Sequence, residues 1–171
     1  TGLGREMVRQ LAQAGADLRP SVVHTSSAAG LAGNFGQANY SAAKLAVLAL
    51  SRVVSVEGRK YGVRSNVISP SARTRLTLSS GKSRHDSGGP KVDASGFDPR
   101  EPGNVSPVVA WLAQRDCPAD SQIFHVTANR VLIVSMPQIV TTVTTKGRWT
   151  LDALDRELGP RLVTQPSVEA Y

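Results

Sequence analysis

The sequence is short of cysteine and of long apolar runs, and each shortage excludes a class of protein. Cys117 is the single cysteine among 171 residues, so an internal disulfide is impossible and we expect a reducing compartment, the cytoplasm. No run of about 18 apolar residues occurs, and the first residues do not read as a charged and then apolar leader. The sequence therefore predicts neither a membrane span nor secretion.

Metal-ligand spacing and aromatic residues are also scarce. Cys117 and the three histidines, His24, His85 and His125, do not fall into any metal-binding pattern, so we interpret the histidines as structural or solvated and expect no metal. A net charge of +7 would suit a nucleic-acid partner. Aromatic residues make up only 5% of the chain, however, and the basic residues are dispersed, so we expect neither a nucleic-acid nor a membrane partner.

One segment carries most of the chemical information. The apolar pair Val22 and Val23 predicts a strand, which leads through Ser27 and a glycine-rich loop to Tyr40 and Lys44 at the start of a long helical pattern. Four residues make about one helical turn, so the phenol and the ammonium project from the same face. A phenol alone titrates near pH ~10, whereas a cation one turn away favours the phenolate and makes Tyr40 a usable general acid or base.

Taken alone, tyrosine and lysine four residues apart are more often an ordinary pair on a helix surface. Here the glycine loop can bring the hydroxyl of Ser27 back toward the phenol, where both could bond the same reacting oxygen. This context favours a catalytic interpretation.

Ser27 stands thirteen positions before Tyr40, and the run of residues 36–44 reads GQANYSAAK. With these features, residues 21–77 resemble the active-site segment of the short-chain dehydrogenase/reductase family, in particular multifunctional-enzyme-type hydroxyacyl-CoA dehydrogenases and 3-oxoacyl reductases. The resemblance implies that Tyr40 gives or takes the proton at the substrate oxygen and that Ser27 orients that oxygen. It also implies that Lys44 favours the phenolate and binds the nicotinamide ribose, so that Tyr40 and Lys44 both meet the cofactor.

Two further segments resemble cofactor-binding parts of that family. Gly2, Leu3 and Gly4 open a helical pattern, where backbone N–H groups and the helix dipole can meet a phosphate. They resemble the end of the family's glycine-rich dinucleotide loop. Pro70, Ser71 and Thr74 correspond to the segment that holds the nicotinamide, although Ser71 replaces the glycine that is usual there. The resemblance implies NAD or NADP and leaves the choice open.

The fold that we expect is α/β, a partial Rossmann-like, doubly wound parallel sheet that lacks the first strand and much of the nucleotide-binding half. The opening helix ends near Ala16, and the chain then passes directly to the strand at residues 21–25. The missing units amount to roughly 100 residues. Strands at residues 21–25, 63–69 and 122–127 should still pair, with residues 131–135 added beside the last of them. The first strand would then have an open edge, so we expect a homo-oligomer.

The expected organisation is a single incomplete domain over residues 1–163 with a frayed tail at 164–171. Residues 78–106 lack any period and predict a mobile loop, either a lid over the substrate or a disordered connector. Ser106 is expected to cap a helix that begins at Pro107, and Thr150 to cap a closing helix.

The sequence is compatible with two functions. The resemblance implies an NAD(P)-dependent oxidoreductase that moves a hydride between nicotinamide and a carbonyl or secondary alcohol of a small molecule, such as an acyl thioester. The missing cofactor walls favour a second hypothesis, a non-catalytic remnant of such an enzyme that acts only by self-association.

Overall fold

The computed structural model describes residues 6, 9–10, 13, 19–75 and 92–162. The chain divides into two compact units, Thr1–Ser135 and Met136–Tyr171. The candidate residues Gly2, Leu3 and Gly4, most of the opening helix, His85, the part of the loop before residue 92 and the tail at 164–171 lie outside the described residues. The predicted domain boundaries therefore stay a prediction.

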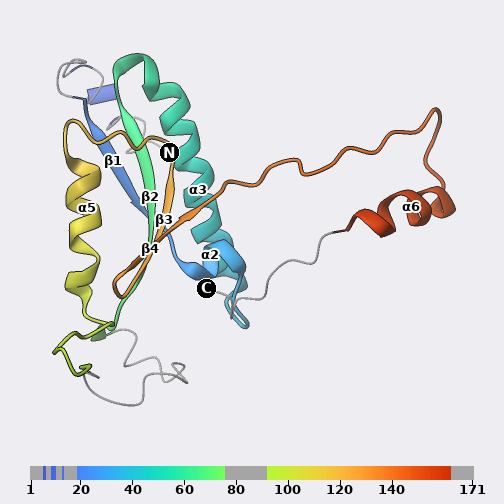
Figure 1. Ribbon diagram of the computed structural model, residues 1–171. Helices are drawn as coiled ribbons and strands as arrows, with labels where there is room; N and C mark the ends of the chain where they lie inside the picture. The colour runs from blue at the N-terminus through green and yellow to red at the C-terminus, as the bar shows by residue number, and fades with distance from the viewer. Residues whose placement is uncertain (1–5, 7–8, 11–12, 14–18, 76–91, 163–171) are drawn as a thin grey trace. The chain divides into compact units, whose positions relative to one another are not determined.

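The first unit is built on a sheet with the strand order β1-β2-β3-β4 (Figure 1). The strands are β1 (Ser21–Thr25), β2 (Arg64–Ser71), β3 (Ile123–Thr127) and β4 (Arg130–Val134). The first three strands are parallel, and β4 pairs antiparallel with β3 after a two-residue turn. This α/β arrangement confirms the expected partial Rossmann-like fold.

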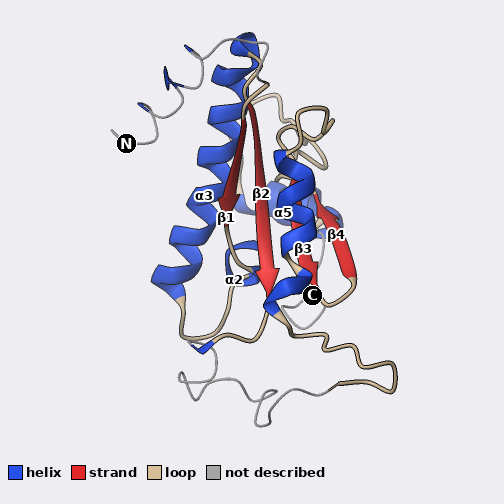
Figure 2. Cartoon of the chain, turned by 90° about the vertical axis from the view of Figure 1, so that its left-hand side faces the viewer, coloured by secondary structure: helices blue, strands red, loops and turns tan. Residues whose placement is uncertain are grey.

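Helices cover both faces of the sheet. Helix α3 (Ala38–Gly58) lies on one face and α5 (Ser106–Ala113) on the other (Figure 2). Successive side chains of a strand point to opposite faces, so β1 to β3 supply both cores. The α3 face buries Val22, Val54 and Val63. The α5 face buries a larger cluster, made of Ile68, Leu112, Cys117, Ala119, Phe124 and Val126. Fully burying a Val, Leu, Ile or Phe side chain stabilises the folded state by about 1.5–3 kcal/mol.

The end of β2 corrects one expectation from the sequence. The strand predicted at residues 63–69 stops before Pro70, but β2 continues through Pro70 to Ser71, where it pairs with Thr127 of β3. The pairing between β1 and β2 stops at Ile68. Pro70 therefore needs ladder bonds to only one neighbour, and its missing N–H is tolerated at this position.

The connections differ from the predictions at two helix starts. A short helix that was not predicted, α2 (Ala28–Ala32), occupies the glycine-rich loop. Ser106 was expected to cap the helix before Pro107, but it is the first residue of α5, and the cap position belongs to Val105. The reason is that the short 3₁₀ helix η3 (Pro102–Asn104) leads directly into α5, so the chain is already helical at Val105.

The second unit contains α6 (Leu151–Leu158), followed by the short 3₁₀ helix η4 (Gly159–Arg161). As predicted, Thr150 caps α6, since its hydroxyl accepts a hydrogen bond from the N–H of Ala153 over 3.2 Å. None of the residues of α6 is buried.

Across the described residues, no helix combines the length and the apolar composition that crossing a bilayer requires.

Candidate active site

The candidate site forms where β1 and β2 end. Parallel strands bring their carboxyl ends to the same edge of a sheet, which is where ligands bind in open α/β folds. At this edge β1 ends at Thr25 and the chain turns into α2, while β2 continues to Ser71. The N–H of Ser26 donates a hydrogen bond of 2.7 Å to the carbonyl of Ile68, which joins the two strand ends.

Ser27 occupies the N-cap of α2. Its hydroxyl oxygen accepts a hydrogen bond of 3.3 Å from the N–H of Ala29. A serine hydroxyl is both a donor and an acceptor, and the cap uses only its acceptor side. Because Ser27 is half-buried, its O–H group can still donate a hydrogen bond to another oxygen at this edge.

Tyr40 and Lys44 lie in the first turns of α3. The Lys44 ammonium stands 5.7 Å from the centre of the Tyr40 ring, so the two side chains share one side of the helix, as the spacing predicts. Lys44 Nζ also donates a hydrogen bond of 3.1 Å to the carbonyl of Thr25, only two residues before Ser27. Tyr40 is 43% exposed and therefore open to a ligand. The structure thus brings the Tyr40 and Lys44 pair to the turn that carries Ser27.

The turn between β1 and α2 also holds the backbone of α3 at Lys44. The buried hydroxyl of Ser26 donates a hydrogen bond of 2.7 Å to the carbonyl of Lys44. Gly30 packs directly on the same residue, since a Cβ at Gly30 would stand 2.7 Å from Lys44 Cβ and 2.8 Å from its carbonyl carbon. Sequence reasoning missed both residues. Their only signals were a second hydroxyl beside Ser27 and one glycine among three.

Two of the three residues predicted to hold the nicotinamide stand at the end of β2. Pro70 and Ser71 are half-buried there, two and three residues beyond the Ile68 carbonyl that bonds Ser26. Thr74 follows outside the strand and is exposed. Pro70 and Ser71 therefore share the sheet edge with Ser27.

Of the two described histidines, His125 is buried and His24 is half-buried. His24 Nε2 is 3.1 Å from the hydroxyl of Ser65, and His125 Nδ1 is 3.0 Å from the hydroxyl of Ser69. Burial lowers the pKa of both rings. At His125 the hydrogen bond with Ser69 opposes this shift, and the positive charge of Arg130 adds a smaller lowering of the pKa. Among the residues that the structure describes, no three His, Cys, Asp or Glu side chains gather to hold a metal ion.

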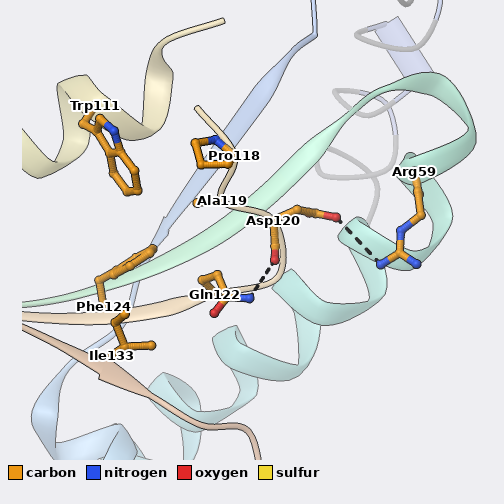
Figure 3. A pocket seen from close by; sticks show the side chains of 8 residues that line it. All are labelled: Arg59, Trp111, Pro118, Ala119, Asp120, Gln122, Phe124 and Ile133. Atoms are coloured by element: carbon orange, nitrogen blue, oxygen red, sulfur yellow. Dashed lines mark hydrogen bonds and ion pairs between the residues drawn. The ribbon is translucent and has the colours of Figure 1, made fainter. Parts of the chain in front are cut away.

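A separate surface hollow of about 410 Å³ lies on the α5 side of the sheet (Figure 3). Trp111, Phe124 and Ile133 form its apolar part, and Trp111 packs edge-on against Phe124 with ring centres 5.9 Å apart. Asp120 and Gln122, at its polar end, precede β3, so this end of the hollow lies at the amino ends of the strands. The hollow is therefore distinct from the edge that carries Ser27 and Lys44.

Three parallel strands covered by helices, with a Tyr and Lys pair at their carboxyl ends, form part of a Rossmann-like α/β fold. The family model described as short chain dehydrogenase matches residues 16–85, which include β1, α3, β2 and every described candidate residue. This part of the chain therefore belongs to the short-chain dehydrogenase/reductase family.

Individual proteins show the same relationship. The chain is 37% identical over 107 residues to peroxisomal multifunctional enzyme type 2 of Mus musculus, an alignment that covers 63% of this chain and 13% of that protein. It is 39% identical over 119 residues to the hydroxyacyl-CoA dehydrogenase ChsB1 of Mycobacterium tuberculosis, covering 69% of this chain and 36% of that protein. A crystal structure of a short chain dehydrogenase from Mycobacterium avium aligns with a TM-score of 0.67 at 32% identity, covering 87% of this chain and 47% of that one.

The chain thus spans less than half the length of these relatives.

Proposed function

We propose that this chain carries the proton-transfer half of an NAD(P)-dependent short-chain dehydrogenase, with Ser27, Tyr40 and Lys44 as its catalytic residues. The observation that carries the proposal is the position of Lys44. Its ammonium lies 5.7 Å from the Tyr40 ring centre and is bonded to the Thr25 carbonyl beside Ser27. A cation fixed at this place favours a negative charge on the phenol oxygen.

The donors of Lys44 fit a nicotinamide nucleotide. An ammonium group has three N–H donors, and the described contacts of Lys44 use one of them, toward Thr25. Two donors remain for hydroxyl groups such as those of a ribose. In this proposal Pro70, Ser71 and Thr74 hold the nicotinamide, and Gly2, Leu3 and Gly4 meet the phosphates. The bound nucleotide supplies or accepts the hydride.

The residues of the chain handle the proton and the substrate oxygen. In the reducing direction Tyr40 donates its phenolic proton to the carbonyl oxygen, and Ser27 donates a hydrogen bond to that same oxygen. Lys44 stabilises the phenolate that remains. In the oxidising direction the phenolate takes the proton of the alcohol. Tyr40 can reach the substrate oxygen in both directions because its ring is exposed where the strands end.

The names of the relatives support one substrate class. A hydroxyacyl-CoA dehydrogenase is among them, so we propose a hydroxyacyl or oxoacyl thioester as the small-molecule substrate. Other relatives are named peroxisomal, so the proposed site of action is either the peroxisome or the cytoplasm that the lone cysteine suggested. We also propose that the chain acts as a homo-oligomer, as expected from the open edge of β1.

A titration of the purified chain with NADH and NADPH tests this proposal. Nucleotide fluorescence reports binding, and absorbance at the nicotinamide band reports turnover with an oxoacyl thioester. Tyr40→Phe is the matched variant, because it removes only the phenolic oxygen. We expect Tyr40→Phe to keep nucleotide binding and to lose turnover by at least roughly a hundredfold.

The alternative hypothesis predicts a different result. If wild type fails to bind either nucleotide at millimolar concentration, the catalytic proposal is wrong and the chain is a non-catalytic remnant. Concentration-dependent self-association, measured by sedimentation, would then be its remaining activity.

A further inference from the structure

Arg73, which follows β2 at the candidate cofactor edge, is held by an ion pair from another part of the chain. Its guanidinium contacts the carboxylate of Asp98, and the two side chains are only 12% and 15% exposed. The N–H of Arg73 donates a second bond, of 2.7 Å, to the carbonyl of Arg100. Both the side chain and the backbone of Arg73 are thus bound to residues 98–100.

Asp98 is itself fixed at three points. The second oxygen of its carboxylate accepts a hydrogen bond of 2.9 Å from the N–H of Arg100. The carbonyl of Asp98 accepts a bond of 2.9 Å from the Asn104 amide and one of 3.2 Å from the N–H of Glu101. These residues form the turn that precedes α5, and α5 is anchored in the core by Leu112, which is fully buried. Arg73 is therefore connected to a rigid helix.

A pair with so little exposure is screened less than a surface ion pair, so removing one partner leaves a charge without compensation in a partly dry site. We expect the residues within two positions of Arg73 to move first. They include Ser71 and Thr74, which are also proposed nicotinamide contacts.

We infer that Arg73 and Asp98 are positioning residues, which hold residues 70–74 in the conformation that binds the nicotinamide end of the cofactor. This inference rests on the proposed function. Neither side chain touches the reacting atoms. Both act through Pro70, Ser71 and Thr74, so the ion pair sets nucleotide affinity while Tyr40 and Lys44 set the proton transfer.

Asp98→Asn tests the inference, because the amide keeps the size of the carboxylate and an acceptor for the Arg100 N–H but removes the charge. We expect the dissociation constant for the preferred nucleotide to rise roughly tenfold. Arg73→Lys keeps a cation opposite Asp98 and should recover part of the affinity, whereas Arg73→Gln should not. The turnover number at saturating nucleotide should stay near the wild-type value in Asp98→Asn.

Hydrogen exchange in the nucleotide-free chain supplies a second readout. The amides of Arg73 and Arg100 should exchange faster in Asp98→Asn, while that of Val67, bonded to the Gln122 carbonyl in the sheet, should not change. Unchanged nucleotide affinity in Asp98→Asn, with wild type binding normally, would overturn the positioning role and leave the proposed function intact. Failure of wild type itself to bind either nucleotide would overturn both.

Discussion

The hydroxyl of Ser26 donates a hydrogen bond of 2.7 Å to the backbone carbonyl of Lys44, 18 residues further along the chain. Ser26 is 3% exposed, and its own N–H is bonded to Ile68 of β2. One buried serine thus joins β1, β2 and α3 at the point from which the Lys44 side chain leaves its helix. The rotation of α3 about its axis, and with it the direction of Tyr40 and Lys44, depends on this contact.

Replacing Ser26 with alanine should therefore impair the site more than it impairs the fold. Loss of a single buried hydrogen bond costs about 1 kcal/mol in the free energy of unfolding, which urea denaturation measures. Displacing Lys44 by a fraction of an ångström should lower turnover on the order of tenfold to a hundredfold.

Ser51→Ala is the matched control for that experiment. Ser51 is also a buried serine of α3 and is 2% exposed, but its hydroxyl forms a hydrogen bond with the hydroxyl of Ser65 in β2, away from the candidate site. It should lose similar stability and keep its turnover. Equal turnover in Ser26→Ala and Ser51→Ala would contradict the role of Ser26.

Gly30→Ala should destabilise the first unit. The new Cβ would meet the backbone of Lys44 at 2.8 Å and the backbone nitrogen of Leu45 at 2.9 Å, and these atoms cannot rotate away as a side chain can. Overpacking of this kind costs about 1–3 kcal/mol. Gly103→Ala serves as the control, because its Cβ would meet nothing closer than 3.4 Å, at the Glu101 carboxylate. An unchanged urea midpoint for Gly30→Ala would show that α2 and α3 can separate without cost.

The sequence predicted those parts of the site that depend on local residue spacing, and it missed those that depend on contacts between distant residues. The strand at residues 21–25 and the helix that carries Tyr40 were predicted because apolar spacing reports burial directly. Helix α2 was missed because three glycines within seven residues indicate a loop, whereas Gly30 is required by a contact with Lys44 that no local pattern reveals. The end of β2 was placed too early for a related reason, since only the sheet shows that Pro70 has one neighbour to pair with.

The two described histidines should make stability depend on pH. Burial lowers the folded-state pKa of His24 and His125 below the unfolded value near ~6.5. The unfolded chain then binds more protons in acid. The contribution of the two histidines to the free energy of unfolding is therefore fully present above pH ~6.5 and is lost as the pH drops below that value. Melting temperatures between about pH 7.5 and 5 measure this effect.

The variant His125→Asn assigns that slope. Its amide can still bond the Ser69 hydroxyl but takes up no proton in this range. The melting temperature of the variant should fall less between neutral pH and pH 5 than that of wild type. An identical slope would show that His125 does not contribute to the acid sensitivity.

Arg64 stands at the amino end of β2, opposite the end that carries the candidate site. Its side chain is buried, and its guanidinium donates to the carbonyls of Gln114, at 2.7 Å, and of Leu112, at 3.4 Å. These carbonyls stand at the end of α5, where a helix leaves its last C=O groups without partners inside the helix and its dipole favours a cation. Removing the cation by Arg64→Met relieves its desolvation but takes a charged donor from both carbonyls, which keep, among the described contacts, only the N–H of Cys117 on Gln114 and the hydroxyl of Ser21 on Leu112. Because a hydrogen bond from a charged donor contributes about 1.5–3 kcal/mol, we expect net destabilisation by about that amount and faster exchange of the α5 amides. Arg52→Met, which loses one exposed bond to Ser121, should stay within about 0.5 kcal/mol of wild type. If Arg64→Met proved as stable as Arg52→Met, the desolvation cost of the buried guanidinium would equal the value of its bonds, and α5 would not depend on this cap.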